Sequence, residues 1–444
     1  MISRSSKVFY ALLNFSGAAA AMPIVVYVLP YFATNLGMGL TTVGSIFVLG
    51  RVMDIFTDPI MGTLIDRYPS RWGKHKHWIA LSLPILMLST VLLYLPINTN
   101  PSGWYFFFSL FLLYSGFTLS GITQLSWSVF LAPSYDDKTN LLTLREAVNV
   151  FFSLLVLAIP AFVELYFNAP IETKILAIGV FVLVLLPVIV STALFKVPDS
   201  KEISAEVLHP FKVFKTFFYN RNLKIVVSAG VLVVLAQGAQ GATALFVIDY
   251  VLNLPEYSAR MILLYFFSSI CGLQIWRKLA LKRSKHEAAF ICAVYVATMS
   301  FIAYLGWEYY LIDNPQYMLI GSSIAFVSIG IAYAGVNPLI VAMVADLAKQ
   351  DNELYGQDRS ASMYSFFTLF LKFGNAFAAS IPYLILGLFS VFEPSLGINN
   401  TSESLDLLWN LYIFIPIICY ILAALIIKQY KYNCLLYTSP SPRD

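Results

Sequence analysis

Three charged residues lie inside one apolar run, and their spacing points to ion chemistry. Arg51, Asp54 and Asp58 belong to a run of apolar residues that begins near Val43. Steps of three and four residues place their side chains on one face of a helix, with neighbouring Cβ atoms about 6 Å apart. An Asp or Arg inside a membrane costs on the order of 3 kcal/mol, so the three would cost about 9 kcal/mol unless they were paired, hydrated or neutralised.

One arginine cannot neutralise two carboxylates, and the remaining negative charge favours a small cation or a proton. Thr57 lies between the two acids and adds a hard oxygen of the kind that such cations prefer. Pro59 removes the hydrogen bond that its N–H would give to the Ile55 carbonyl, which leaves a main-chain oxygen free in the same turn. We therefore expect Asp54 and Asp58 to bind the ion. A clamp between helices is the structural alternative, but it needs only one acid.

Lys372 is a further charge in an apolar segment. It lies about ten residues into its run, roughly 15 Å deep at 1.5 Å per residue, which is farther than a lysine side chain comfortably reaches toward the interface. Asp54 or Asp58 is its natural partner or competitor. A lysine that faces a hydrated cavity without a specific role is the alternative.

Polar residues gather around Trp127 in the sequence GITQLSWS. Hydroxyl and amide groups beside an indole suit a sugar, whose hydroxyls need hydrogen bonds and whose apolar ring face needs an aromatic plane. We therefore assign Trp127, Thr123 and Gln124 to substrate binding, with helix packing by small polar residues as the alternative. Arg145 and Asn149, at the start of the next run, are assigned to the same site. Arg145 suits an interfacial anchor equally well.

The elements that position these residues are membrane-spanning helices. The chain has 444 residues, of which 59% are hydrophobic and 12% charged, and its mean hydropathy is +0.75. The charged fraction is about half that of a soluble domain. Twelve apolar runs reach spanning length: 9–33, 42–65, 78–97, 104–131, 147–168, 172–195, 225–252, 257–281, 287–307, 317–346, 362–392 and 406–427. We predict an all-α membrane protein, with 132–146 as a loop or a loop and a short interfacial helix.

The loops predict the orientation of these helices. Connections after odd-numbered runs lack Lys and Arg or lean acidic, whereas those after even-numbered runs are basic, as in the segment from Arg67 to Lys76. By the positive-inside rule the basic loops and both termini are cytoplasmic. We interpret Asp66 and Arg67 as a gating loop, since an acid at a helix end beside basic residues forms a breakable ion-pair network. Asp346 is interpreted as a cytoplasmic gate or cap, and Arg51 as structural.

A weak internal repeat divides the chain into two halves of six helices. GTLIDRYPSRWGKHKH after the second run is similar to GLQIWRKLALKRSKH after the eighth, with a glycine at Gly62 and Gly272 before a basic loop. Secondary transporters are commonly built from such repeats, with the site between them. We predict a first bundle over 1–195, a cytoplasmic middle loop over 196–224, a second bundle over 225–433 and a non-native tail over 434–444.

Several function classes are disfavoured by the same sequence. The net charge is only +4 and the basic residues form short segments, so nucleic acid is not an expected partner. There is no G-x-x-x-x-G-K-[ST] motif for ATP. His75 and His77 lie in a basic loop without ligand partners, and the four cysteines lack metal or redox spacing. We expect no enzyme activity, no cofactor beyond the transported ion and no metal beyond Na⁺ on Asp54 and Asp58.

Two long motifs resemble a known family. DPIMGTLIDRYPSRWGKHKHW and AMVADLAKQDNELYGQDRSASMYSFFTLFLKFGNAFAAS are similar to the signatures of the glycoside-pentoside-hexuronide:cation symporters, the branch of the major facilitator superfamily that includes the melibiose carrier. LQIWRKLALKRSKH fits the counterpart loop, and the resemblance extends to Asn433. It implies a twelve-helix bundle of two pseudo-symmetric halves.

The resemblance also implies a cation site. The family's site matches Asp54 and Asp58, with Thr57 where the melibiose carrier has an amide and Ser120 where it has a threonine. All four supply oxygen, which is consistent with Na⁺, with H⁺ or Li⁺ as alternatives.

The implied sugar site matches in part. The family's stacking tryptophan matches Trp127, its fifth-helix arginine Arg145 and its eleventh-helix lysine Lys372. The melibiose carrier's two sugar-binding acids fall on Ala19 and Thr123. A pentoside, or a uronate that Arg145 and Lys372 would neutralise, is therefore an alternative to a galactoside.

Together these patterns predict an inner-membrane symporter, acting as a monomer, that imports a sugar with Na⁺ or H⁺ by alternating access. A uniporter without ion coupling, or a carrier of lipid or another small solute with the same fold, is the alternative. The sequence does not specify the sugar, the ion, the stoichiometry or the conformational state.

Overall fold

The computed structural model describes residues 4–68, 70–96, 100–132, 135–199, 218–355, 360–389 and 392–430, and these residues are predominantly helical. The elements of the first half are α1 (Arg4–Leu12), α2 (Phe15–Pro23), the π-helical turn η1 (Ile24–Val28), α3 (Leu29–Ala33), α4 (Leu40–Arg67), α5 (Lys76–Tyr94), α6 (Gly103–Leu131), α7 (Tyr135–Phe167) and α8 (Ile171–Lys196). Those of the second half are α10 (Arg221–Phe246), the π-helical turn η2 (Val247–Val251), η3 (Pro255–Tyr257), α11 (Ser258–Lys282), α12 (Lys285–Gly306), η4 (Trp307–Leu311), η5 (Pro315–Tyr317), α13 (Met318–Tyr355), α14 (Ser360–Phe389), η6 (Pro394–Asn399) and α15 (Ser402–Ile427).

Eleven helical stretches in the described part of the chain are long and apolar enough to cross a membrane. The helix α4, with 28 residues, contains the predicted run 42–65. It also contains the charged residues from which the ion site was predicted, Arg51, Asp54 and Asp58. The predicted membrane fold of helices is confirmed.

Two helices extend beyond their predicted bounds. The helix α7 begins at Tyr135, so the segment predicted as a loop near 132–146 is for the most part the first third of a continuous helix. The helix α13 continues to Tyr355, nine residues past the predicted end at 346. Hydropathy marks where lipid ends, whereas helical hydrogen bonding continues for as long as the backbone is uninterrupted.

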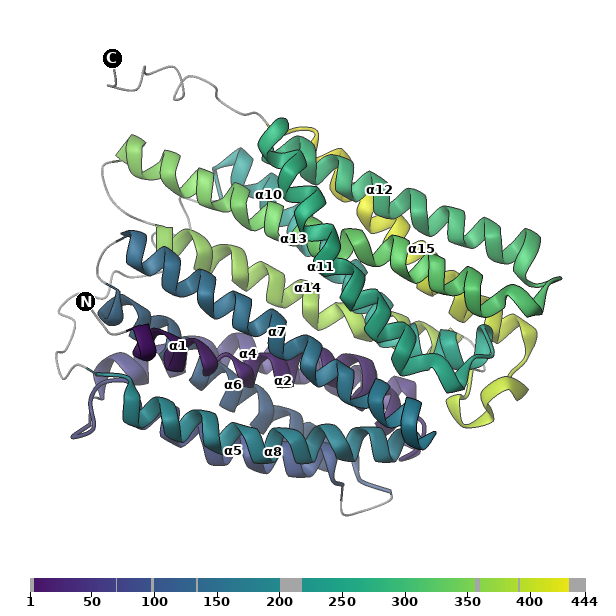
Figure 1. Cartoon of the computed structure of the whole chain (residues 1–444), viewed down its shortest axis with the longest axis horizontal. Helices are drawn as coiled ribbons and strands as arrows, with labels where there is room; N and C mark the ends of the chain where they lie inside the picture. The colour runs from purple at the N-terminus through teal and green to yellow at the C-terminus, as the bar shows by residue number, and fades with distance from the viewer. Residues whose placement is uncertain are drawn as a thin grey trace.

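The helices form two groups that lie side by side (Figure 1). The elements from α1 to α8 pack mainly among themselves, as do those from α10 to α15. The two groups meet along two long helix pairs, α4 with α14 and α7 with α11, and at the contact of α10 with η1. These pairs are where charged residues from both halves come together. The residues predicted as the middle loop and the tail lie largely outside the described part.

The described residues contain three π-helical turns, and two of them, η1 and η2, occupy matching places in the first and seventh helices; the third, η4, follows α12. The sequences of η1 and η2, IVVYV and VIDYV, share a Tyr-Val ending, and each of these two turns continues an α-helix near the same end of the bundle. A π turn inserts one residue into a helix and is uncommon. Its recurrence at equivalent places supports the internal repeat.

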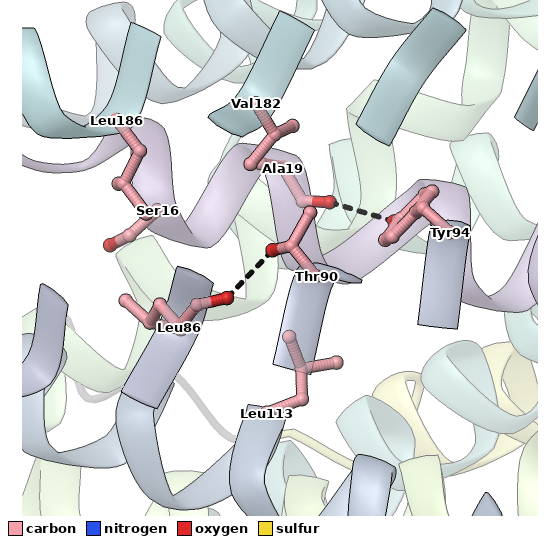
Figure 2. Close-up of a pocket in the computed structure, with 8 residues that line it drawn as sticks. All are labelled: Ser16, Ala19, Leu86, Thr90, Tyr94, Leu113, Val182 and Leu186. Carbon is pink, nitrogen blue, oxygen red and sulfur yellow. Dashed lines mark hydrogen bonds between the residues drawn. The ribbon is translucent and has the colours of Figure 1, made fainter. Parts of the chain in front are cut away.

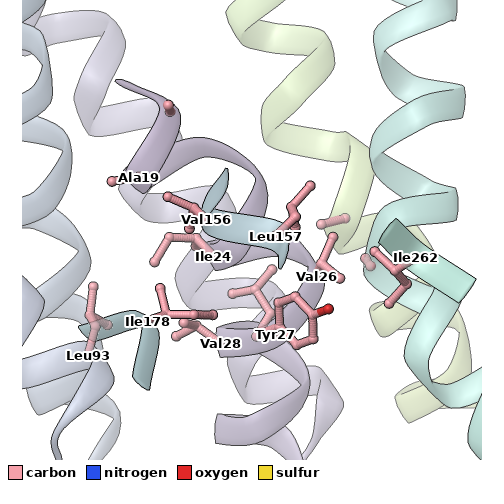
Figure 3. Packing of buried hydrophobic residues seen from close by; sticks show 14 of the residues in the cluster. Ala19, Ile24, Val26, Tyr27, Val28, Leu93, Val156, Leu157, Ile178 and Ile262 are labelled. Carbon is pink, nitrogen blue, oxygen red and sulfur yellow. The ribbon is translucent and has the colours of Figure 1, made fainter. Parts of the chain in front are cut away.

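The apolar core extends across the interface between the groups at the end that contains η1, which we call the outer end (Figure 3). Val26 and Leu157 from the first group and Ile262 from α11 belong to one cluster and are each at most 3% exposed. Separating the two groups would expose this apolar surface, which is unfavourable. These contacts therefore hold the groups together at this end.

Candidate ion and substrate site

Asp58 joins the two helix groups at a site about a quarter exposed. Thr118 of α6 donates a hydrogen bond to Asp58 Oδ1 over 3.0 Å, and Lys372 Nζ of α14 contacts Asp58 Oδ2. The side chains of Asp58 and Lys372 are 25% and 28% exposed. A residue from each half therefore contributes to one ion pair, as the sequence analysis anticipated for Lys372.

Lys372 compensates the charge of Asp58 in this conformation. The sequence predicts this lysine as a partner or competitor for Asp54 or Asp58. A cation or proton that binds Asp58 must therefore replace or release the ammonium. The side chain of Asp54, the second predicted ligand, lies outside the described residues, and Thr57 on the same helix is half-buried.

Arg51 lies one helical turn before Asp54 and two turns before Asp58, and its guanidinium packs against aromatic rings. Its guanidinium carbon is 4.2 Å from the centre of the Tyr114 ring and 5.4 Å from that of Phe47. A guanidinium over an aromatic face is attracted by the negative face of the ring, an interaction worth about 0.5–2 kcal/mol. These contacts fit the structural role predicted for Arg51.

Thr118, rather than Ser120, supplies the hydroxyl at Asp58. The Ser120 hydroxyl lies 3.4 Å from the Ser16 hydroxyl of α2 and is buried there. Residues two apart are separated by about 200° around a helix, so the two side chains of α6 face different neighbours. In this conformation Ser120 does not contact Asp58, which corrects its predicted geometry.

Gln124 and Arg145 lie together, as predicted for a shared site. Arg145 Nε donates to Gln124 Oε1 over 2.9 Å, and Gln124 Nε2 donates to the Tyr10 carbonyl over 2.8 Å. The Tyr10 hydroxyl in turn donates to the Gln124 carbonyl over 2.6 Å. Thr123 is fully buried, and its hydroxyl has no hydrogen-bond partner among the described residues. Asn149 is half-buried on α7.

Trp127 is enclosed by protein on all sides. It is 0% exposed, and its ring stacks on His75 with 5.9 Å between centroids and 12° between planes. The Tyr10 ring approaches edge-on at 6.3 Å, and the indole N–H donates to the Pro198 carbonyl over 3.0 Å. The stacking face expected for a sugar is occupied by His75 in this conformation.

The His75 ring is fixed by a carboxylate at the end of α8. Its Nδ1 lies 2.7 Å from Asp199 Oδ1, and its Nε2 lies 3.2 Å from the Ser126 hydroxyl. The backbone N–H groups of His75 and Lys76 also donate to Asp199, over 2.7 and 3.0 Å. Burial raises the pKa of Asp199, but these hydrogen bonds outweigh it, so the pKa lies below the ordinary carboxyl value. His75 thus has a positioning partner that the sequence analysis did not identify.

The predicted gating residues are described only in part. Asp346 Oδ1 accepts from Lys285 Nζ over 2.6 Å, which joins α13 to the start of α12 within the second half. The side chains of Asp66 and Arg67 lie outside the described residues. Their predicted gating role stays a prediction.

A small cavity lies between the helices of the first half (Figure 2). The space open to the centre of a water-sized probe is about 10 Å³, which is about what one water molecule requires. Its lining is mostly apolar and includes Ala19, where the resemblance would place a sugar-binding acid. The Thr90 and Tyr94 hydroxyls at its wall already donate to carbonyl oxygens. The cavity is therefore far too small for a sugar.

A second cluster of charged residues joins the halves at the outer end and was missed from the sequence. Glu164 of α7 contacts Lys174 of α8 and Arg260 of α11, and Asp249 of η2 lies nearby. Glu164 and Asp249 both lie inside apolar runs, so the criterion that identified Asp58 would also have identified them.

Comparison with known sequences identifies similar transporters. The profile of the family described as MFS/sugar transport protein matches residues 9–434. An uncharacterized symporter of Bacillus subtilis (strain 168), YjmB, is 24% identical, covering 90% of this chain and 86% of its own. The isoprimeverose transporter of Lactiplantibacillus pentosus is 21% identical, covering 97% and 89%. The sodium-dependent lysophosphatidylcholine symporter 1-B of Danio rerio is 23% identical, covering 87% and 79%.

Solved structures show the same fold. The crystal structure of the nucleoside transporter NupG superposes with a TM-score of 0.67 at 12% identity, over 96% of this chain and all of that one.

Proposed function

The chain belongs to the MFS/sugar transport protein family, and from this we propose that it imports a glycoside-type sugar together with Na⁺ or H⁺ by alternating access. The family and its structural neighbours are membrane transporters, so the protein is a transporter and not an enzyme. Among its relatives are proteins named as symporters, which move a small solute with an ion.

The ion pair of Asp58 with Lys372 is the observation that supports cation coupling. It joins a helix of each half, and both side chains are partly exposed. A cation that takes the place of the Lys372 ammonium on Asp58 would neutralise the carboxylate and separate α4 from α14 electrostatically. Occupancy of the site would thereby change the free energy of moving one half against the other.

Ion and sugar affinities should then raise each other by the same factor, because coupling between two sites is reciprocal. At a membrane potential of about 100 mV, one co-transported positive charge supplies about 2.3 kcal/mol, or roughly fifty-fold accumulation of a neutral sugar. Asp54 and Thr57 remain our proposed further ligands for the ion.

For the substrate we propose a glycoside, pentoside or hexuronide bound near Gln124 and Arg145. The hydrogen-bonded pair of Arg145 and Gln124 supplies charge and amide groups of the kind that bind sugar hydroxyls or a uronate. Trp127 would stack on the sugar only in a conformation in which His75 has left its ring. A relative named as an isoprimeverose transporter supports the sugar class.

A thermal-shift screen of the purified protein tests this proposal. The panel contains pentosides, galactosides, glucuronides and lysophosphatidylcholine, each with NaCl and with choline chloride. We expect one sugar class to raise the unfolding temperature, and to raise it further with Na⁺, or at lower pH if H⁺ is the coupling ion. Stabilisation by sugar that is equal under all ionic conditions would indicate a uniporter and contradict ion coupling.

A lipid carrier is the second candidate, because relatives named as sodium-dependent lysophosphatidylcholine symporters align over most of the chain. Stabilisation by lysophosphatidylcholine and by no sugar in the same screen would favour it. The Asp58 site would serve cation coupling in either case.

We propose that the basic ends of the helices face the cytoplasm of a bacterial inner membrane. An impermeant amine reagent added to intact cells should leave the exposed Lys278 and Lys282 unmodified and should modify them in inverted vesicles. Modification in intact cells would overturn this topology.

A further inference from the structure

Glu164 is a buried carboxylate whose partners come from both halves. Its side chain is 1% exposed. It accepts from Lys174 Nζ over 2.6 Å, from Arg260 Nε over 3.2 Å, and from the backbone N–H groups of Ala259 and Arg260 over 2.9 and 3.1 Å. These donors belong to one residue of α8 and two residues of α11.

The backbone donors belong to the first turn of α11, which lies in the other half of the molecule. The first N–H groups of a helix have no partner within the helix, and the positive end of the helix dipole attracts an anion there. The residue before α11, Tyr257, supplies no side-chain cap. Glu164 of α7 therefore caps a helix across the interface, where a local residue would ordinarily do so.

The positive and negative charges around Glu164 balance each other, whereas a site that binds a cation would have excess negative charge. Asp249 accepts from the Ser258 hydroxyl and interacts electrostatically with Lys174. With Arg260, the outer-end cluster contains two carboxylates and two cations. A solute cation would find no uncompensated charge there.

The other helix pair between the halves, α4 with α14, is also closely packed. The Ser380 hydroxyl of α14 donates to the Gly44 carbonyl of α4 over 3.0 Å, and a Cβ at Gly387 would lie 3.2 Å from Thr41 Cβ. The bundle is thus closed at the outer end by direct contact between the halves.

We propose that Glu164, by capping α11, is the residue that holds the outer end closed. The inference rests on the alternating access of the proposed function. It adds the residue that sets the relative stability of the outward-closed and outward-open states. Opening toward the outside must withdraw Glu164 from the α11 amides and from Arg260, whereas Lys174 of α8 belongs to the same half as Glu164. Removing its charge lowers the barrier and shifts the population toward the outward-open state.

Thiol labelling tests this without transport. Ile262, which lies one turn into α11 and is 3% exposed, is replaced by Cys in a variant whose four native cysteines are Ser. In whole cells, an impermeant maleimide should label this Cys at least about tenfold faster when Glu164→Gln is added, since loss of one partner of a buried ionic network shifts an equilibrium by that much or more.

Glu172→Gln is the matched control. Glu172 also lies near the outer end and accepts from Asn35 Nδ2 over 2.6 Å, but both residues belong to the first half and are exposed. Its removal should leave the labelling rate unchanged. Equal rates for Glu164→Gln, Glu172→Gln and the parent would overturn the proposal.

A disulfide provides the second measurement. With Thr41→Cys and Gly387→Cys the two Cβ atoms would lie 3.2 Å apart, so a small outward shift brings them to the roughly 3.5–4.5 Å of a disulfide, and oxidant should cross-link the closed form. Glu164→Gln should slow cross-linking by a similar factor, and unchanged cross-linking would contradict the proposal. If Glu164→Gln is not monodisperse by gel filtration, Arg260→Gln, which removes one donor and leaves the amides, is measured instead. Both readings are independent of sugar and ion, so a wrong substrate assignment leaves them intact.

Discussion

Within the described ranges, acid–base contacts join the halves of this transporter at Asp58 and at Glu164, and these two contacts differ in what can replace their partners. At Asp58 the partners include a hydroxyl and an ammonium, and the carboxylate is 25% exposed. At Glu164 the partners are two cations and two backbone amides, and the carboxylate is 1% exposed. Under our proposal a solute cation takes the place of Lys372, whereas no solute can take the place of the amides of α11.

The comparison separates an exchangeable contact from a permanent one. Breaking a buried ion pair costs about 3–5 kcal/mol, whereas a partly exposed pair is worth much less because water competes for its charges. Only the exposed pair is suited to respond to ion concentration. The buried pair is suited to setting which conformation is more stable.

The largest expected effect is at the exchangeable contact. Asp58→Asn removes the charge that would hold the cation, so ion-stimulated uptake should be lost entirely. Uptake of labelled sugar into vesicles, with Na⁺ and with choline or at two pH values, measures this. Asp346→Asn, whose partner Lys285 lies within the second half, should retain ion stimulation. Unchanged ion dependence in Asp58→Asn would refute the assignment.

A buried aromatic residue extends the comparison to the other end of the first half. Trp127→Ala removes a fully enclosed ring and should lower the free energy of unfolding by about 3–5 kcal/mol. Thermal or denaturant unfolding in detergent measures this. Trp104→Ala, on the same helix but 80% exposed, should have little effect. If Trp127→Ala were fully stable and only raised the sugar KM, the ring would be primarily a substrate contact.

Lys372→Gln sharpens the comparison by removing the internal competitor. The concentration of Na⁺ that gives half-maximal thermal stabilisation should fall about tenfold, or about 1.4 kcal/mol, because the cation no longer displaces an ammonium. Lys285→Gln serves as the control. An unchanged Na⁺ requirement would mean that Lys372 does not compete at Asp58.

The smallest expected effect concerns Asp199 and its dependence on pH. Since the folded-state pKa of Asp199 is below the ordinary value of 3.8, its stabilisation is present above that value and is lost as the pH falls below it. Asp199→Asn should therefore lower stability at neutral pH by about 1–2 kcal/mol. This difference should diminish below about pH 4. A constant difference down to pH 3 would show that the carboxylate charge does not contribute.

The sequence was most informative where a free-energy cost depends only on the position of one residue. A charge inside lipid is costly wherever it lies, so Asp58 and Lys372 could be identified from position alone, and their pairing followed from opposite charge. The bundle of helices followed from the lengths of the apolar runs. The boundary of α7 did not, because hydropathy reports lipid contact and not backbone hydrogen bonding.

The direction in which a helical side chain points, and its contacts with residues distant in the sequence, could not be derived in the same way. Ser120 and Thr118 are equally polar, and only the rotation of α6 determines that Thr118 contacts Asp58. The surroundings of Trp127 depend on Pro198 and His75, which are distant in sequence. Glu164 could have been found by the cost argument, but its role as a cap for α11 required the packing of the two halves.

The π turns η1 and η2 give the first and seventh helices a phase shift. One inserted residue advances a helix by about 100°, so the stripe of side chains before the turn and the stripe after it look in different directions. In each of these helices, the residues before the π turn and the residues after it therefore direct their side chains toward different neighbours. Mutations before the turn and mutations after it should accordingly affect different neighbouring helices, even when their spacing in the sequence suggests one common face.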